Sequence, residues 1–326
     1  MIGSRTIFAK RMPTVRKLGN KALLWISTRY SDVLDGYALN NPESVQLQLV
    51  ARCNLRCPKC PVPETTFTSQ YPVQQMDPSD LEHLVRVVGN NCNVYVVSLW
   101  GEALLHKRLP EALYVLRHKK ILISTNLNVS HDRIKMLIEF HEQFGAIEEL
   151  IISVDGYDKE SYETYYRLGG KFELLDANIV AISKSKLRHK AILQFLDDGS
   201  RVGFAKRCAE YARSKGIAFT IPTMDENFAR TDSSNILGQG ICDRSYIGLH
   251  VDSSNNIMTC GADPLNTLNI ASIREFTTFD SLWNSAAMRH RRVQLRRDKN
   301  HYDVCKGCAG CVAMVSADRH VVREQR

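Results

Sequence analysis

The sequence lacks any long hydrophobic run. No stretch of its 326 residues approaches the roughly 18 consecutive apolar residues of a membrane-spanning helix. The apolar run nearest the start, residues 22–26, is too short for the core of a signal peptide. Hydrophobic residues make up 44% of the chain and charged residues 24%, which excludes a disordered, collagenous or coiled-coil protein. We therefore expect a globular, cytoplasmic protein.

Acidic residues are absent from positions 1–31, and the whole chain has a net charge of +8. The positive charge admits an anionic ligand, but it gathers at the two ends without base-stacking aromatics, so we expect no nucleic-acid binding. Apolar residues recur at helical spacing near the start, at Val15, Leu18, Ala22 and Ile26. This N-terminal arm fits a basic helix packed on the next domain. Contact with a membrane surface or an anionic substrate, or a transit peptide, is the alternative.

Ten cysteines are too few for a disulfide scaffold in a chain of this length. Reduced thiols that cluster bind metal or perform redox chemistry. One group consists of Cys53, Cys57 and Cys60, and a second of Cys242, Cys260, Cys305, Cys308 and Cys311, while Cys92 and Cys208 stand alone.

Between the two cysteine groups, β-branched apolar runs alternate with segments of helical periodicity, a pattern typical of parallel strands joined by crossovers. We predict an α/β fold, a partial (β/α)6 barrel, because six such units do not close an eightfold barrel. The predicted strands are 46–50, 93–99, 121–124, 149–154, 190–195 and 218–221. The predicted helices are 77–88, 109–116, 131–144, 171–184 and 201–215. Ligands of such folds gather at the carboxyl ends of the strands.

The first cysteine group has the spacing CxxxCxxC and follows the first predicted strand directly. Four thiolates in two pairs would suit structural zinc. Three thiolates on one tight loop can instead hold three irons of a cubane iron-sulfur cluster, which leaves the fourth iron open for an outside ligand. The spacing therefore predicts a reactive cluster.

With this loop and the motifs after it, the chain resembles a radical S-adenosylmethionine (SAM) enzyme. Trp100-Gly101-Glu102-Ala103 is similar to the family's GGEP segment, which receives the SAM ammonium group, and Ser124-Thr125-Asn126 is similar to its TNG segment. Residues 152–156 and 165–170 resemble the segments that contact the SAM ribose and carboxylate. The resemblance implies a [4Fe-4S] cluster on Cys53, Cys57 and Cys60. The SAM contacts that it implies are Gly101, Glu102, Thr125, Asn126, Ser153, Asp155 and Arg167.

Three positions depart from the family pattern. Lys59 stands where an aromatic residue often lies beside the adenine, Ala103 replaces a proline, and Leu127 replaces the glycine of TNG. The two latter changes predict an altered backbone, but neither removes a metal ligand. Taken alone, Glu102 or Arg167 would more often form a surface ion pair, so the assignment depends on their joint position after consecutive strands.

The second cysteine group resembles the SPASM auxiliary-cluster module in its shortened twitch form, as in the 2-deoxy-scyllo-inosamine dehydrogenases. Residues 251–257 predict a hairpin between Cys242 and Cys260. We assign Cys242, Cys260, Cys305 and Cys308 to an auxiliary [4Fe-4S] cluster, with Cys311 a spare or a substitute. A structural zinc knuckle is the alternative for this group alone. The expected domains are an N-terminal extension (1–44), a radical SAM core (45–235) and a SPASM/twitch domain (236–326).

The resemblance implies an oxidoreductase in which a 5′-deoxyadenosyl radical from SAM abstracts a substrate hydrogen and the auxiliary cluster accepts an electron. An epimerase would need a thiol beside the substrate. Cys92 precedes a strand and Cys208 lies in an apolar helical stripe, so we favour dehydrogenation, with Cys311 the residue that could overturn it. No catalytic residue is assigned.

The expected substrate is a hydroxylated small molecule or carbohydrate, and the expected electron donor is an external flavodoxin or ferredoxin. A peptide maturase or epimerase is disfavoured because few residues precede the first strand. An iron-sulfur or zinc scaffold is the non-enzymatic alternative. The basic run 289–297 could hold an anion, although a solvated helix face is the more common case.

Overall fold

The computed structural model describes residues 19–58, 60–72, 75–197, 199–221 and 242–306. Lys59, Cys308, Cys311 and most of the N-terminal arm lie outside the described residues.

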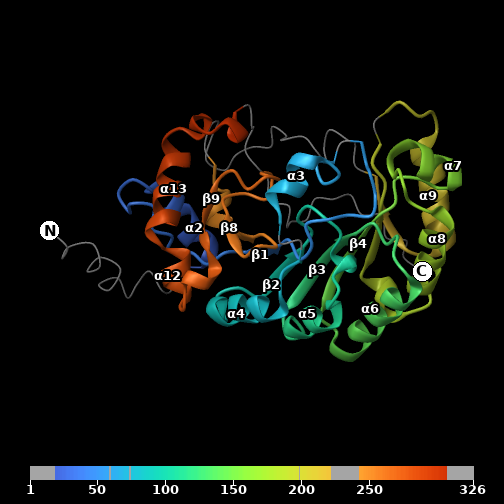
Figure 1. The fold of residues 1–326 in the computed structure, drawn as a ribbon, viewed down its shortest axis with the longest axis horizontal. Coiled ribbons are helices and arrows are strands. Elements are labelled where there is room, and N and C mark those ends of the chain that lie inside the picture. Colours follow the sequence, from blue (N-terminus) through green and yellow to red (C-terminus); the bar gives the residue numbers. More distant parts are fainter. Residues whose placement is uncertain (1–18, 59, 73–74, 198, 222–241, 307–326) are drawn as a thin grey trace.

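Six parallel strands follow one another across the sheet in chain order, which confirms the predicted partial (β/α)6 barrel (Figure 1). Each lies within three residues of its predicted position. The strands are β1 (Ser44–Leu47), β2 (Val94–Val97), β3 (Lys120–Thr125), β4 (Ile147–Ser153), β5 (Ala191–Gln194) and β6 (Ala218–Thr220).

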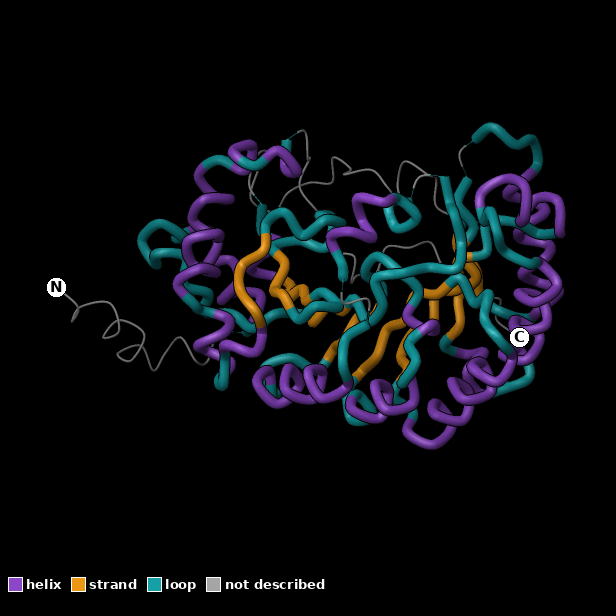
Figure 2. Tube along the Cα trace, in the orientation of Figure 1, coloured by secondary structure: helices purple, strands orange, loops and turns teal. Residues whose placement is uncertain are grey.

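The five predicted crossover helices are all present, and Figure 2 shows them on the outer side of the sheet, below the strands and at the right of the view. They are α4 (Pro78–Val88), α5 (Leu109–Val115), α6 (His131–Phe144), α8 (Phe172–Ser183) and α9 (Phe204–Lys215). Shorter helices are α3 (Thr65–Gln70), η2 (Ala103–Leu105), α7 (Lys159–Ser161), the π-helix η3 (Tyr162–Tyr166) and η4 (Lys186–His189).

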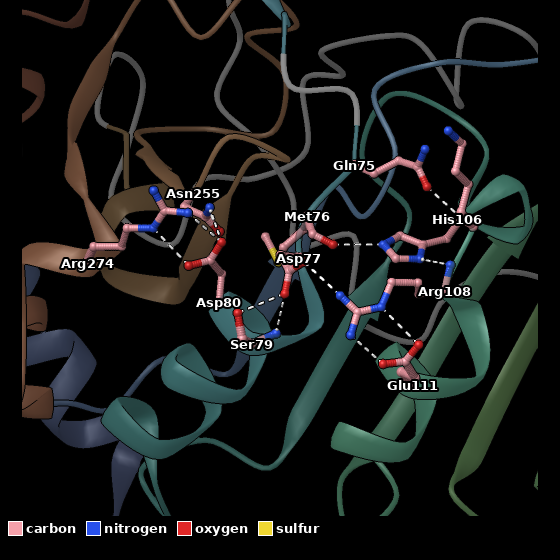
Figure 3. A network of polar contacts seen from close by, with 11 residues as sticks. Gln75, Met76, Asp77, Ser79, Asp80, His106, Arg108, Glu111, Asn255 and Arg274 are labelled. Carbon is pink, nitrogen blue, oxygen red and sulfur yellow. Dashed lines mark hydrogen bonds and ion pairs between the residues drawn. The ribbon is translucent and has the colours of Figure 1, made fainter.

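Helix α4 begins where its sequence provides a complete start signal (Figure 3). The Asp77 side chain accepts a hydrogen bond from Ser79 N at 2.9 Å, and Pro78 occupies the first helical position, where its missing N–H costs nothing. Leu81, Leu84 and other apolar side chains of the helix are buried against the sheet. Exposed Arg108 pairs with Asp77 at 2.8 Å.

Side chains alternate between the two faces of the sheet, as the geometry of a strand requires. Val45 and Leu47 of β1, like Leu150 and Ile152 of β4, belong to the main apolar core beneath the helices. The intervening residues face away from that core, and near the carboxyl ends of the strands they are polar. They are Gln46, Ser124, Ser153, Gln194 and Thr220. The face opposite the helices therefore carries amides and hydroxyls beside apolar residues such as Val96, Leu122 and Ile151.

The C-terminal segment continues the same sheet. It comprises α11 (Arg244–Ile247), β7 (Gly248–Val251), β8 (Asn256–Met258), β9 (Asn269–Ser272), η5 (Ile273–Glu275), α12 (Phe279–Trp283), α13 (Ala286–Arg297), η6 (Lys299–His301) and η7 (Asp303–Cys305). β7 pairs in parallel with β1, and β8 pairs antiparallel with β7, which confirms the predicted hairpin. Asp80 of α4 accepts hydrogen bonds from Arg274 and Asn255 (Figure 3), so the segment is also tied to the barrel through its side chains.

The N-terminal helix α2 (Asn20–Arg29) packs against α11, which belongs to the C-terminal segment and not to the barrel that follows the arm in the sequence. The Tyr246 hydroxyl donates a hydrogen bond to Ser31 Oγ at 2.7 Å. Trp25 and Tyr30 each retain 49% exposure. Among the described residues, no helix has the length and apolar character needed to cross a membrane.

The basic run on α13 differs from the expected solvated face. Arg292 is fully buried and donates hydrogen bonds to the carbonyls of Ser245 and Gly36 at 2.9 and 3.3 Å. Its guanidinium also lies over the rings of Trp283 and Tyr246. The charge is buried because carbonyl oxygens and aromatic faces replace its hydration.

Candidate functional site

The loop that leaves β1 and leads to α3 (Figure 1) carries Cys53, Cys57 and Cys60. Cys57 is buried beside Leu55 and Tyr166, and the other two thiols are partly buried against the same cluster. The backbone N–H of Arg56 donates to the carbonyl of Leu168 at 2.8 Å, which ties the loop to the segment after η3. The loop is therefore held at the carboxyl end of β1, where the sequence predicted a ligand site.

Hydrogen-bond donors point at the sulfur atoms of the loop, including a backbone donor at Val62 for Cys60. Leu55 N and Asn126 Nδ2 each approach Cys53 Sγ at 3.4 Å, and Arg167 Nη1 approaches Cys57 Sγ at 3.5 Å. Burial raises the pKa of Cys53 to about 12, and the nearby Glu102 adds to the rise. Because iron binds the thiolate form, the positive charge of a bound cluster would have to overcome this burial cost.

Gly101 and Glu102 lie directly after β2, as predicted. Gly101 has a φ of +134°, and a Cβ atom there would lie 1.8 Å from the carbonyl oxygen of Val50, so no side chain fits. The Glu102 carboxylate is 1% exposed and accepts hydrogen bonds from Leu104 N, Thr125 Oγ1 and Asn126 N at 3.0, 2.8 and 2.7 Å. Burial raises the pKa of Glu102 in spite of these three donors. Glu102 thus joins the loop after β2 to the loop after β3.

Asn126 connects the third predicted segment to the cysteine loop. Its Nδ2 donates to Asn54 Oδ1 at 3.0 Å as well as to Cys53, and its Oδ1 accepts from Asn128 N at 2.8 Å. Leu127 adopts the left-handed conformation, with φ +54°, although it replaces the glycine of the family motif. The expected change of backbone at this position stays a prediction; the Leu127 side chain is fully buried, which holds the strained conformation in place.

Asp155 and Arg167 form a buried ion pair. Asp155 is fully buried, has a φ of +56°, and accepts a hydrogen bond from Leu196 N at 2.7 Å. Burial alone would lower the pKa of Arg167, but the charges of Asp155 and Cys57 raise it. The guanidinium therefore lies between a carboxylate of this chain and a thiol of the cysteine loop, and its buried Nε has no hydrogen-bond partner.

Ser153 closes β4 on the face turned away from the helices and is partly buried. The structure thus joins Glu102, Thr125, Asn126 and Cys53 in one chain of contacts, and Asp155, Arg167 and Cys57 in another. Among the described contacts, Ser153 belongs to neither of these two networks.

In the described part of the second group, Cys260 and Cys305 lie near enough to Cys242 to act on it electrostatically, but no three His, Cys, Asp or Glu side chains described there form a group that could hold a metal ion. Burial raises the pKa of Cys242, and the neighbouring thiols Cys260 and Cys305 add to the rise. Ala262 N donates to Cys260 Sγ at 3.3 Å. Cys92 and Cys208, by contrast, lie in the apolar core, which confirms the prediction that Cys208 lies on the buried face of a helix; Cys92 precedes β2, as its place in the sequence indicated.

Asn54 and Asn128 contribute to the site, although they were not predicted as site residues from the sequence. Asn54 Nδ2 donates to the carbonyl of Asn128 at 2.7 Å, and Asn128 in turn donates to the carbonyl of Lys171 at 2.8 Å. Asn54 stands inside the CxxxCxxC spacing, which was the available signal. These amides hold the cysteine loop against the end of β3.

Three thiols on one loop match the three protein ligands of a cubane iron-sulfur cluster. Among the described residues, no three His, Cys, Asp or Glu side chains are grouped so that they would hold a single metal ion. A cubane cluster spreads three thiolates over three irons. The unpaired buried Nε atoms of Arg52 and Arg167 lie on residues next to or touching the cysteine loop, and they would suit an anionic group beside the cluster.

Comparison with solved structures supports this fold. SuiB of Streptococcus suis is 12% identical, with a TM-score of 0.60 over 89% of this chain and 78% of its own. The structure of anSMEcpe with bound AdoMet is 16% identical, with a TM-score of 0.54 over 78% and 83%. BtrN in complex with AdoMet and 2-DOIA is 16% identical, with a TM-score of 0.50 over 86% and 98%. At these identities the likeness concerns the fold.

No curated protein sequence matches the chain. The family model of the radical SAM superfamily matches residues 47–227, more than half of the chain, and this range includes the three-cysteine loop and the segments after β2, β3 and β4. The chain belongs to the radical SAM superfamily, which implies a SAM cofactor and a [4Fe-4S] cluster.

Proposed function

We propose that the chain is a radical SAM oxidoreductase that dehydrogenates a hydroxylated small molecule or carbohydrate. The family's cofactors supply the one-electron cleavage of SAM to methionine and a radical that removes a hydrogen atom from the substrate. Cys53, Cys57 and Cys60 would hold the cluster. The observation that carries the proposal is their common loop at the carboxyl end of β1, with N–H donors aimed at the sulfurs.

The proposed SAM contacts follow from the groups that the site leaves unsatisfied. A carboxylate has about four acceptor positions, and Glu102 uses three of them, so the fourth fits the SAM ammonium group beside Gly101. The free Nε of Arg167 suits the SAM carboxylate. Thr125, Asn126 and Asp155 would position these groups through the bonds described above, and Ser153 offers a hydroxyl to the ribose.

Polar side chains on the face of the sheet away from the helices support a hydroxylated substrate. Gln46, Ser124, Ser153 and Gln194 line the side away from the helices, near the carboxyl ends of their strands. Hydroxyl and amide groups match a ligand rich in hydroxyls, whereas an apolar ligand would leave them unpaired.

The second cysteine group is proposed to hold an auxiliary [4Fe-4S] cluster through Cys242, Cys260, Cys305 and Cys308, with Cys311 in reserve. The proximity of Cys242 to Cys260 and Cys305 supports it. Such a cluster would accept the second electron of a two-electron oxidation, while the substrate hydroxyl loses its proton. An external flavodoxin or ferredoxin would supply the reducing electron. The basic N-terminal arm remains proposed as a contact for a membrane surface.

The test is a comparison of cysteine variants purified without oxygen. The wild type should carry about eight irons in two cubane clusters and release 5′-deoxyadenosine from SAM after reduction. Cys53→Ser should abolish that release, and Cys208→Ala, in the apolar core, should preserve it. Cys305→Ala should cleave SAM but fail to oxidise substrate. Colourless protein that carries zinc would contradict the proposal.

A further inference from the structure

His250 of β7 is a fully buried imidazole whose two ring nitrogens both lack a hydrogen-bond partner. Buried polar groups in folded proteins are nearly always paired, and those that are not require an explanation such as a ligand or an internal water. The ring packs against Gly248, the glycine two residues before it in the strand. The backbone of Gly248 interacts with the ring and opposes the lowering of its pKa by burial, but neither ring nitrogen reaches hydrogen-bond geometry with it or with another described residue.

The parallel register of β1 and β7 places His250 directly beside Gln46, so both side chains project from the same face of the sheet. Gln46 is 2% exposed, and its side-chain amide makes no hydrogen bond to a described residue. Gly261, which follows Cys260, lies over the pair. A Cβ atom at Gly261 would come within 3.3 Å of both Gln46 Oε1 and His250 Cδ2. Two unpaired polar side chains thus lie side by side beneath the auxiliary cysteine loop.

Gln48 shows what a structural amide looks like at the next position on this face. Its Nε2 donates to the carbonyl of Trp100 at 2.9 Å, and its Oε1 accepts from Ser253 N at 3.1 Å. Gln48 thereby connects the ends of β1, β2 and β7. Gln46 and His250 have no comparable bonds, so a structural role does not account for them.

The charge state of His250 limits the kind of ligand. Burial, followed by the charge of Arg244, lowers the pKa of His250 to about 3, so the ring is neutral at pH 7. A neutral imidazole offers one donor and one acceptor, and a glutamine amide offers both kinds as well. This combination suits a neutral hydroxyl, which donates one hydrogen bond and accepts others.

We propose that His250 and Gln46 form a subsite that binds a hydroxyl group of the substrate on the face of the sheet turned away from the helices. The inference deepens the proposed function and rests on it, since it assigns the hydroxylated substrate to specific residues. Both are positioning residues, because they fix the substrate and take no part in the electron transfer.

The first test is the stability of the substrate-free holoprotein in urea. His250→Leu removes the unpaired nitrogens and should raise the unfolding midpoint. The matched control is His106→Leu. His106 is equally buried, but its Nε2 bonds to the carbonyl of Met76 at 2.7 Å and its Nδ1 accepts from Arg108 N at 3.1 Å (Figure 3). His106→Leu should therefore lower the midpoint. A midpoint lowered equally by His250→Leu would reveal an internal partner and overturn the proposal.

The second test uses scyllo-inositol as a neutral polyol probe in thermal unfolding. At hundred-millimolar concentration it should raise the melting temperature of the wild type and of His106→Leu more than that of His250→Leu or Gln46→Leu. Equal shifts in all four proteins would show a general solvent effect and would overturn the hydroxyl subsite. The absence of any shift in the wild type would overturn it as well. Formation of 5′-deoxyadenosine by the wild type tests the proposed function separately, because it needs no substrate.

Discussion

Removing the charge of Asp155 tests the link between β4 and the cysteine loop. Asp155→Asn keeps the size of the side chain, tolerates the left-handed φ of +56°, and preserves the acceptor for Leu196 N. It removes only the ion pair with Arg167, whose side chain is 13% exposed. Breaking a buried ion pair on one side costs about 3–5 kcal/mol, and we expect about 3 kcal/mol because Arg167 retains some contact with solvent.

The assay is urea unfolding of the anaerobic holoprotein. With a slope of about 3 kcal/mol per molar urea, the midpoint should fall by about 1 M. Asp77→Asn is the control, since asparagine caps a helix as well as aspartate and the Arg108–Asp77 pair is half exposed. That control should lose less than about 1 kcal/mol. Equal midpoints for the two variants would refute the structural role of the Asp155–Arg167 pair.

Three further predictions follow from individual contacts. Gly101→Ala should lower the free energy of unfolding by more than about 4 kcal/mol or prevent folding, because its Cβ would meet the Val50 carbonyl. The control is Gly145→Ala, at φ +64° with no atom within 4 Å, which should lower it by about 1 kcal/mol in the same urea assay. Arg292→Met should lower the free energy of unfolding by about 3 kcal/mol, and with it the urea midpoint by about 1 M, since it leaves the buried carbonyls of Ser245 and Gly36 unpaired; an unchanged midpoint would contradict this. The folded pKa of His250, about 3, lies below the unfolded value of about 6.5, so the unfolded chain binds the extra proton and stability falls on acidification. Between pH 6.5 and pH 5 the loss should reach about 2 kcal/mol, and denaturation curves of His250→Leu should lack that part of the pH dependence.

The parallel core could be predicted because its signals are local. Helix α6 occupies the predicted residues, His131–Phe144, and ends at Gly145 in the left-handed conformation. Runs of β-branched residues predict the individual strands, and the alternation of strands with helices predicts that the strands are parallel. The first strand is shifted, however. β1 ends at Leu47 and not at residue 50; beyond it the Gln48 N–H still donates to the carbonyl of Val251, and the carbonyl of Leu49 accepts from Met76 N, which lies outside the strands.

The pairing of distant residues could not be predicted. The sequence indicated a hairpin at 251–257, but not that β7 would pair in parallel with β1. Both Asp155 and Arg167 were assigned to SAM from their motifs, and only the fold shows that they pair with each other. The burial of Arg292 within a basic run likewise depends on carbonyls supplied by α11 and by the turn at Gly36.

The most direct test of the account is electron paramagnetic resonance of the reduced protein with and without SAM. A cluster held by Cys53, Cys57 and Cys60 has one iron without a protein ligand, so SAM should change the cluster signal, and Cys53→Ser should remove that signal. A spectrum of the reduced wild type that SAM leaves unchanged would contradict the proposed site.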